Sequence, residues 1–436
     1  MRISGLLKLS FWISFILAYI GPFGFIIDLG PFSLYPFRLA YLVMTFLLII
    51  DWLVRPSRFT RFLQTSLSYG WFFLMWMVYL VFLSLWIVNM DYAKNELFNL
   101  AIFITFTLFS IYLVEDERDF RNLMRVWLAF YIVNIAVGTW EVLTGSHLPT
   151  SKYHISSFET YKAEVSILFY KSFMPTTFFN NQNNFATYLT LSIPVVFFYV
   201  KRLWPRIILS LSGVFLLLAT LSRANLIALT LEAFALPFFL NRRQNAIYLP
   251  ILAVSSFLAV FMVYLIATTP LNIKDPRIQD FYENVRMKIV NFMKGGMGKR
   301  ELSTRVRMGL IENSLYYFEK TSGIGTGPGQ LEYYIDKYPV AYTYFIKNPH
   351  NWWLEILTKY GILVFLLYSL FLIYLFYNFL HLRQCPLARG LALALLGFIP
   401  GSISPSGMVT FFPMWSFFII SLSYIKVTSR AGRCVL

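Results

Sequence analysis

Hydrophobic stretches long enough to cross a bilayer as helices recur along most of the chain. They begin near Leu9, Pro36, Leu67, Leu97, Asn122, Asn184, Ile207, Ala224, Ile247, Gly361, Ala388 and Thr410. A helix needs about 20 residues to cross roughly 30 Å of hydrocarbon. The pattern therefore predicts an all-α, polytopic membrane protein with about twelve transmembrane helices.

Two polar segments interrupt this pattern, at residues 144–179 and 269–350. Spanning helices satisfy their own backbones, so polar inserts between them lie outside the membrane, and long loops usually have a function. We therefore predict a single membrane domain over residues 1–436 with a first extracytoplasmic loop at 144–179. The large extracytoplasmic loop at 269–350 is expected to carry part of the active site.

Lysine and arginine accumulate in alternate connections between the hydrophobic stretches. The basic connections contain Arg2 and Lys8; Arg55, Arg58 and Arg61; Arg118, Arg121 and Arg125; Lys201, Arg202 and Arg206; Arg242 and Arg243; Arg383 and Arg389; and Lys426, Arg430 and Arg433. Such connections face the cytoplasm in membrane proteins. Both termini are therefore predicted to be cytoplasmic. The first hydrophobic stretch lacks a small-x-small cleavage pattern and is expected to remain a helix.

Composition supports the same class, since 58% of the residues are hydrophobic and 13% are charged, with a mean hydropathy of +0.62. The net charge is +16. Anionic lipid headgroups explain about half of the basic residues, and the excess in the large loop indicates an anionic ligand. Membrane lipids are thus expected partners, and nucleic acid is not.

The two cysteines, Cys385 and Cys434, fall in segments predicted to be cytoplasmic. Thiols stay reduced in that compartment. The sequence therefore predicts neither a structural disulfide nor a cysteine-based metal site.

A histidine and an arginine stand at unusual places. His350 ends the large loop just before Trp352 and Trp353, which places an imidazole at headgroup depth. It could exchange a proton or, as a cation, bind phosphate; the alternative is a structural or capping role. Arg223 lies between two hydrophobic stretches with almost no loop, where charged residues usually have a function. It suits bidentate phosphate binding, and snorkelling to headgroups is the alternative.

Further candidates lie in the polar segments. Arg305 and Arg307 precede the glycine run 323–329, in which Gly325 and Gly327 could let backbone amides approach an anion. The run lacks a following Lys-Ser/Thr, so a nucleotide-binding loop is rejected, and a tight turn between helices remains the alternative. The run Asn180–Asn184 offers donors and acceptors for sugar hydroxyls or for a helix cap.

Two carboxylates lie within or near hydrophobic stretches, Glu141 and Glu232. Interhelical hydrogen bonds are the expected role of both. No Asp-x-Asp or His/carboxylate cluster on the predicted outer face suggests a divalent metal.

Taken in order, several of these segments resemble motifs of the O-antigen ligase and polymerase superfamily, which includes teichuronic acid polymerase-like proteins. The matching segments are Phe179 to Ala186, Ser222-Arg223, Ser303-Thr304-Arg305, Gly323 to Gly329, and His350-Asn351-Trp352-Trp353-Leu354-Glu355 with Gly361. Together they cover about residues 140 to 370. One departure is Gly309, where the superfamily often has tryptophan after the loop arginine.

The resemblance implies a metal-independent glycosyltransferase of the bacterial cytoplasmic membrane that needs no cofactor. Its donor would be a glycan on undecaprenyl diphosphate, and a flippase and a chain-length regulator of the same pathway are candidate partners. Arg223 and Arg305 would hold the diphosphate, with Arg307 as a second candidate, while His350 would act on the acceptor hydroxyl or on phosphate. The remaining candidate substrate-binding residues are Asn180, Asn183, Asn351, Gly325 and Gly327.

Three functions are therefore considered. A polysaccharide polymerase is preferred because no added soluble domain for a protein acceptor is present. A ligase that transfers the glycan to a lipid or another surface acceptor shares every motif. A flippase for lipid-linked oligosaccharides would instead place ionisable residues and broken helices near mid-membrane.

Overall fold

The computed structural model describes residues 3–21, 26–28, 33–151, 174–240 and 302–435, with isolated residues between 265 and 290. This part of the chain is helical apart from one antiparallel pair of short strands, β1 (Ile27–Asp28) and β2 (Ser33–Leu34), in which Ile27 faces Leu34. The all-α prediction is confirmed for the described residues. Large parts of the two predicted loops lie outside them.

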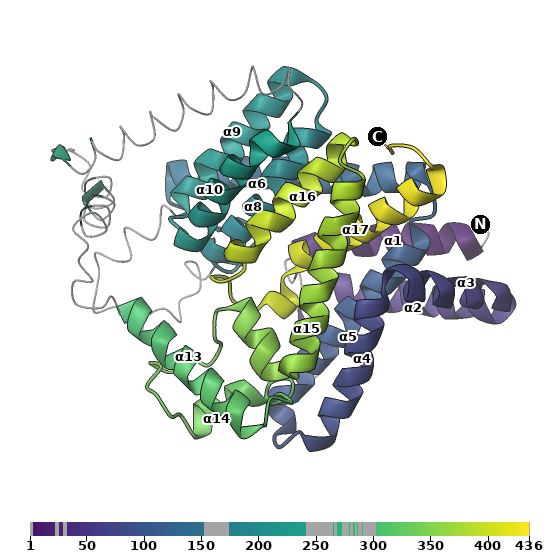
Figure 1. Ribbon diagram of the computed structural model, residues 1–436, viewed down its shortest axis with the longest axis horizontal. Helices are drawn as coiled ribbons and strands as arrows, with labels where there is room; N and C mark the ends of the chain where they lie inside the picture. Colours follow the sequence, from purple (N-terminus) through teal and green to yellow (C-terminus); the bar gives the residue numbers. More distant parts are fainter. Residues whose placement is uncertain are drawn as a thin grey trace.

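The helices follow the hydrophobic stretches of the sequence (Figure 1). They are α1 (Ile3–Ile20), α2 (Pro36–Val54), α3 (Pro56–Tyr69), α4 (Trp71–Leu83), η1 (Ser84–Trp86), α5 (Met90–Leu113), α6 (Glu117–Thr144), α8 (Gln182–Tyr199), α9 (Leu203–Ala219), α10 (Arg223–Phe239), α13 (Leu302–Lys320), α14 (Gln330–Lys337), α15 (Trp352–His381), α16 (Pro386–Gly401), η3 (Met408–Thr410) and α17 (Phe412–Ala431). Every expected stretch contains a helix except the one near Ile247, which lies outside the described residues.

The predicted number of about twelve spans is not confirmed. Among the described helices, α1, α2, α5, α6 and α15 are long and apolar enough to cross a membrane, and the bent pair of α3 and the α4–η1 segment could add a sixth span. The helices α9 and α16 are apolar but shorter. In α17 every residue from Phe412 to Thr428 is buried, so its serines and Lys426 face protein. Helices enclosed by other helices need less apolar sequences than lipid-facing ones.

Helix α3 occupies a segment that the sequence analysis treated only as a basic connection. Pro56 begins it, and Arg58 donates to the buried Asp51 at 2.8 Å. The α3 axis meets that of the following apolar segment at 96°. Between them lies Gly70, where an added Cβ would come within 2.4 Å of the Leu108 side chain.

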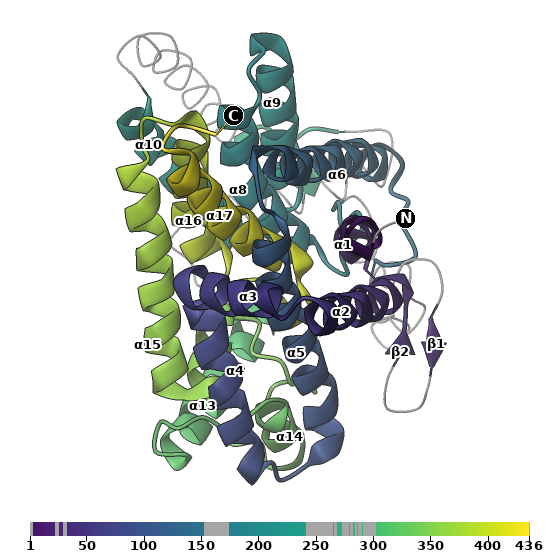
Figure 2. The same ribbon diagram turned by 90° about the vertical axis from the view of Figure 1, so that its right-hand side faces the viewer.

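Aromatic side chains form the centre of the fold around α17. The Trp415 ring stacks on Phe103 at 5.7 Å and on Trp76 at 6.0 Å, measured between ring centroids. These rings come from α17, α5 and α4, so three segments distant in sequence meet at one place. Figures 1 and 2 show α17 among the other helices, while α13 and α14 lie at the end of the molecule away from both chain termini.

Helix α16 packs closely against α8 and α10 because it presents glycines to both. A Cβ at Gly390 would lie 2.8 Å from the Pro194 carbonyl oxygen of α8, and one at Gly397 would overlap the Glu232 carboxylate of α10. Small residues at helix interfaces allow backbones to approach in this way. The packing fixes the start of α8 and α10 next to the end of α16.

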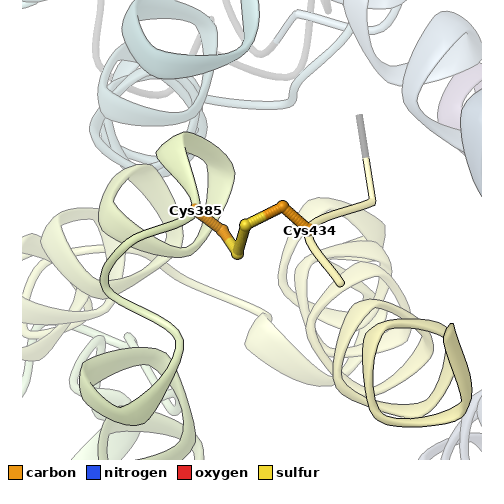
Figure 3. Close-up of a disulfide and its surroundings, with 2 residues drawn as sticks. All are labelled: Cys385 and Cys434. Atoms are coloured by element: carbon orange, nitrogen blue, oxygen red, sulfur yellow. A yellow bond between two sulfur atoms is a disulfide. The ribbon is translucent and has the colours of Figure 1, made fainter. Parts of the chain in front are cut away.

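The prediction that the cysteines are unpaired is wrong. Cys385 and Cys434 form a disulfide, with their Cα atoms 5.4 Å apart (Figure 3). Cys385 precedes α16 and Cys434 follows α17, so the packing of these two helices brings the thiols together. A separation of 49 residues gave no sign of this pairing. The prediction rested on the redox state of the predicted compartment alone.

Candidate active site

The segment between α16 and η3, residues 402–407, connects three of the sequence motifs. Its contacts are the Trp352 amide with the Ser402 carbonyl oxygen at 3.1 Å, the Ser222 and Ser404 hydroxyls at 3.3 Å, and the Asn181 side-chain amide with the Ser406 hydroxyl at 2.6 Å. Trp352 closely follows His350, and Ser222 precedes Arg223. The structure therefore brings the histidine motif, the arginine motif and the asparagine run around one connecting segment, the 402–407 loop.

His350 has a backbone that few side chains adopt. Its φ is +51°, in the left-handed region, and its amide donates to the Asn348 side chain at 2.9 Å. The next residue, Asn351, caps α15 by accepting from the amides of Trp353 and Leu354 at 3.1 and 3.3 Å. Strained non-glycine residues of this kind occur often at functional sites. The histidine is thus held from both sides at the start of α15.

Arg223 is the first residue of α10, and its side chain is exposed. The turn before it contains Leu221 at a φ of +53°. Asn225 fixes this turn, because its side-chain amide donates to the Ser222 hydroxyl at 3.0 Å and its oxygen accepts from Thr190 of α8 at 2.9 Å. The guanidinium therefore projects from a rigid helix start beside the 402–407 loop.

The asparagine run divides into structural and available side chains. Asn181 caps α8, accepting from the amides of Asn183 and Asn184 at 2.9 and 3.1 Å. The Asn184 amide group donates to the Ser406 carbonyl oxygen at 2.9 Å. Within the described ranges, the side chains of Asn180 and Asn183 have no hydrogen-bond partner. These are the two that the sequence analysis assigned to substrate.

Arg305 and Arg307 lie on α13 and are both exposed. Val306 between them is buried with Leu310 against residues of α14. Helix α13 also packs against α15, which carries Asn351 at its cap. Ser222, next to Arg223, and Trp352, close to His350, both contact the 402–407 loop. Arg305 is placed near them by the packing of α13 against α15.

The structure explains why Gly309 departs from the tryptophan common in the superfamily. An added Cβ would come within 2.5 Å of the Tyr342 carbonyl oxygen. Asn313 keeps the 340–343 segment close to Gly309. Its side chain donates to the Gly309 carbonyl oxygen at 2.7 Å and accepts from the Val340 amide at 2.7 Å. The chain around residues 340–343 occupies the space that a large side chain would need.

The glycine run 323–329 packs on a kink in α15 at Gly361, whose φ is +78°. The amides of Thr326 and Gly327 donate to carbonyl oxygens of α15 at 2.9 Å each. A Cβ at Gly325 would come within 2.5 Å of the Gly361 nitrogen. These glycines permit close packing on α15, and the run forms the turn between helices α13 and α14, which was the alternative interpretation. Because the Gly327 amide is used inside the protein, ligand binding by Gly325 and Gly327 stays a prediction.

A buried ionic cluster beneath this turn was missed in the sequence. The Lys359 ammonium lies 3.2 Å from Glu96 and 3.5 Å from Glu355, and it also pairs with Glu332. The Lys359 side chain is 2% exposed. The carboxylates come from α5, α14 and α15, so only the Glu355 to Lys359 spacing of four residues could have indicated it.

This cluster forms one wall of a cavity of about 370 Å³ beside the start of α15. The other lining residues are Asp91, Tyr92, Asn95, Asn99, Gly329, Asn348, Gly407, Val409 and Thr410. Burial raises the pKa of Glu332, although Lys359 acts in the opposite direction. The cavity lies next to His350, because Asn348 lines it and Glu355 is in the first turn of α15.

Two further contacts hold the cavity in shape. The buried Gln330 side chain accepts from the amides of Val88 and Asn89 at 3.0 and 2.9 Å, which fixes α14 to the start of α5. Lys347 pairs with Asp336 at 2.8 Å and lowers the pKa of that carboxyl. Both α14 and the segment before His350 are therefore attached to the cavity wall.

Neither Glu141 nor Glu232 makes the expected interhelical hydrogen bond among the described residues. Glu141 accepts from the amides of Thr176 and Thr177 at 2.6 and 2.7 Å, so it orders the turn before the asparagine run. Glu232 is buried against Gly397, and no described residue bonds its carboxylate oxygens. Glu232 thus places a polar group between α10 and α16, outside the candidate active site.

Comparison with known proteins supports the family resemblance. Residues 207–369 match the family model described as O-antigen ligase. Over 432 residues the chain is 26% identical to the teichuronic acid biosynthesis protein TuaE of Bacillus subtilis (strain 168), covering 94% of this chain and 82% of that protein. The chain is thus similar to the O-antigen ligase family over residues 207–369 and to this relative over most of its length, in agreement with the resemblance to the O-antigen ligase and polymerase superfamily.

This similarity supports a membrane glycan polymerase or ligase of cell-envelope polysaccharide synthesis, with glycosyltransferase-like chemistry. The matched region contains Arg223, Arg305 and His350, together with three of the four cluster residues, Glu332, Glu355 and Lys359. Within the described residues, no group of three or more His, Cys, Asp or Glu side chains is arranged to hold a metal ion.

Proposed function

We propose that this protein is a polysaccharide polymerase that transfers a glycan from undecaprenyl diphosphate to a growing lipid-linked chain at the outer face of the cytoplasmic membrane. The observation that carries the proposal is the convergence of the arginine motif, the histidine motif and the asparagine run around the 402–407 loop, beside an open cavity whose lining includes four acidic residues. Catalysis of group transfer needs charge stabilisation and a proton acceptor close together.

In the proposed reaction, an acceptor hydroxyl oxygen attacks the anomeric carbon of the donor sugar. A glycosidic carbon–oxygen bond forms, and the bond from that carbon to the diphosphate oxygen breaks. Polyprenyl diphosphate leaves with the bonding electrons, and His350 takes the hydroxyl proton. Arg223 and Arg305, with Arg307 as a second candidate, stabilise the charge that develops on the diphosphate.

Metal independence is part of the proposal. The carboxylates Glu96, Glu332 and Glu355 already surround the Lys359 ammonium, which takes the place that a cation would fill. Guanidinium groups bind phosphate oxygens in a fixed geometry and can replace a metal as the positive charge.

The proposed topology has both termini in the cytoplasm and extracytoplasmic loops at 144–179 and 269–350. Both termini lie away from α13 and α14, which supports this arrangement (Figures 1 and 2), whereas the Cys385–Cys434 disulfide near the C-terminus is not expected in a reducing cytoplasm and counts against it. A flippase and a chain-length regulator of the same pathway are proposed neighbours, because substrate must reach the outer face and product length must be set. A ligase would use the same donor site with a different acceptor.

The test uses purified full-length protein in lipid with polyprenyl-diphosphate glycans extracted from its host. Released polyprenyl diphosphate and glycan chain length are measured for wild type, Arg223→Ala, Arg305→Ala and His350→Ala. We expect longer lipid-linked chains from wild type only. Carrier release that requires a separate acceptor would indicate a ligase, and no release under any condition would contradict a transferase.

Matched controls are available at the other end of α15. His381→Ala and Arg383→Ala change the same residue types at exposed positions. We expect both to keep wild-type turnover. Equal loss in these controls would mean that the site variants act through general destabilisation.

A further inference from the structure

The walls of the 370 Å³ cavity carry mostly negative charge. Four of its lining side chains are acidic, Asp91, Glu96, Glu332 and Glu355, and Lys359 alone is basic. Lys359 is enclosed by three of these carboxylates, so its charge is already compensated inside the protein. Asp91 pairs with Lys94 at 2.7 Å, so the excess negative charge that an anionic ligand would meet comes from the three carboxylates around Lys359.

Two carboxylate oxygens in the cavity wall lack a hydrogen-bond partner in the part of the chain that is described. They are Oε1 of Glu355, a residue that is 1% exposed, and Oε2 of Glu332. A carboxylate oxygen only accepts hydrogen bonds, and buried acceptors are nearly always satisfied. Both side chains line the cavity, so a small displacement of either would present an acceptor to a ligand that supplies hydrogen-bond donors.

The remaining polar lining suits a ligand rich in hydroxyl groups. Asn95, Asn99 and Asn348 offer both donors and acceptors, and Thr410 adds a hydroxyl. The oxygen of Asn99 accepts from Arg38 at 2.8 Å, which leaves its amide hydrogens for a ligand. The volume falls within the range of about 300 to 1,000 Å³ that is usual for small-molecule sites.

We propose that this cavity binds a sugar unit of the acceptor glycan and selects a unit without a carboxylate or phosphate group. The inference rests on the proposed transferase function, since the cavity adjoins His350, which is assigned to the acceptor hydroxyl. Positive and negative side chains thus have separate roles within one site. Arginines serve the diphosphate of the donor, while Glu332 and Glu355 accept from sugar hydroxyls of the acceptor.

The first experiment measures binding, which needs no turnover. Wild-type protein in lipid nanodiscs is titrated with chitotetraose, a neutral chain, and with tetragalacturonic acid, in which every sugar carries a carboxylate. Bound sugar is followed by saturation-transfer NMR. We expect the neutral chain to bind at least about tenfold more tightly. Equal or tighter binding of the carboxylated chain, or no binding of the neutral chain, would overturn the proposal.

Isosteric variants locate the selectivity. Glu332→Gln and Glu355→Gln each remove one negative charge, so each should narrow the preference for the neutral chain. Glu319→Gln removes a charge from the exposed side of α13 and should leave it unchanged. Asp91→Asn repeats the test at an exposed lining position if a buried variant fails to fold. If the cavity variants and Glu319→Gln prefer the neutral chain to the same extent, the assignment of this selectivity to Glu332 and Glu355 is wrong.

A second experiment separates this proposal from the transferase function. With the host's lipid-linked glycan, Glu355→Gln should raise the acceptor KM about tenfold, as expected for one weakened charge-assisted hydrogen bond, whereas Arg223→Ala should abolish carrier release. An unchanged KM in Glu355→Gln would contradict the acceptor site. No release by wild type would refute the transferase function, and the binding experiment would still decide whether the cavity selects neutral sugars.

Discussion

The two ends of α15 hold ionisable side chains in opposite environments. At its start, Glu355 and Lys359 are buried and paired with residues from two other helices. At its end, His381 and Arg383 are exposed. Burying charge is costly unless every group has a partner. The start of the helix therefore holds a buried ion cluster beside the cavity, while the other end is exposed.

The same contrast extends to neighbouring helices. Near the exposed end, Arg389 donates to the Phe239 carbonyl oxygen at 3.0 Å, and Lys426 donates to that of Ile111. These cations bind the free carbonyls of helix ends, which is a structural task. At the other end, carboxylates outnumber cations around the cavity. Charge at one end supports the fold, and charge at the other lines an open cavity.

Lys359→Met is expected to have the largest effect. The variant leaves three carboxylates together without a positive charge, and breaking a buried ion pair in this way costs about 3–5 kcal/mol. Thermal denaturation in detergent measures it, with Arg383→Met at the exposed end as the control, expected to change stability by no more than about 0.5 kcal/mol. Similar denaturation temperatures for the two variants would refute the contrast between the ends.

Cys385→Ser tests the disulfide at the exposed end. A disulfide contributes about 2–4 kcal/mol by restricting the unfolded chain. We expect reductant to lower the denaturation temperature of wild type towards that of Cys385→Ser and to leave the variant unchanged. Maleimide labelling of folded wild type should find no free thiol. Two labelled thiols together with an unchanged denaturation temperature would show that the disulfide does not form.

The sequence predicted the positions of the helices better than the contacts between them. Hydrophobic runs located nearly every helix, because a run of apolar residues is a local property. The crossing helices could not be counted from it, since α8 and α17 are enclosed by protein and carry polar residues. The disulfide and the Lys359 cluster depend on contacts between distant segments, which no local pattern contains. Arg223, His350 and the asparagine run could be named as candidates because each stands out beside its neighbours in sequence, and their roles stay predictions.

Gly361→Ala tests the kink that places the glycine run over the cavity. An added Cβ would lie 1.9 Å from the Ile324 carbonyl oxygen, and the residue has a φ of +78°. Gly432→Ala is the matched control, because its φ is +62° and nothing lies within 4 Å of its Cβ. The left-handed backbone costs both variants about 1–2 kcal/mol, and the clash should cost Gly361→Ala about 1–3 kcal/mol more. Equal losses in thermal denaturation would mean that the turn can move away.

The smallest effect is expected from pH at the rim of the cavity. Lys347 lowers the pKa of Asp336 below its ordinary value of 3.8. The ion pair therefore stabilises the folded state above that pH, and the contribution is lost as the pH falls through the lower folded-state pKa. Lys347→Met should denature at a lower temperature than wild type at pH 7, and the difference should shrink below pH 3.8. A difference that stays constant with pH would show that Lys347 acts by packing, which would leave the buried cluster as the sole electrostatic support of the cavity among the described residues.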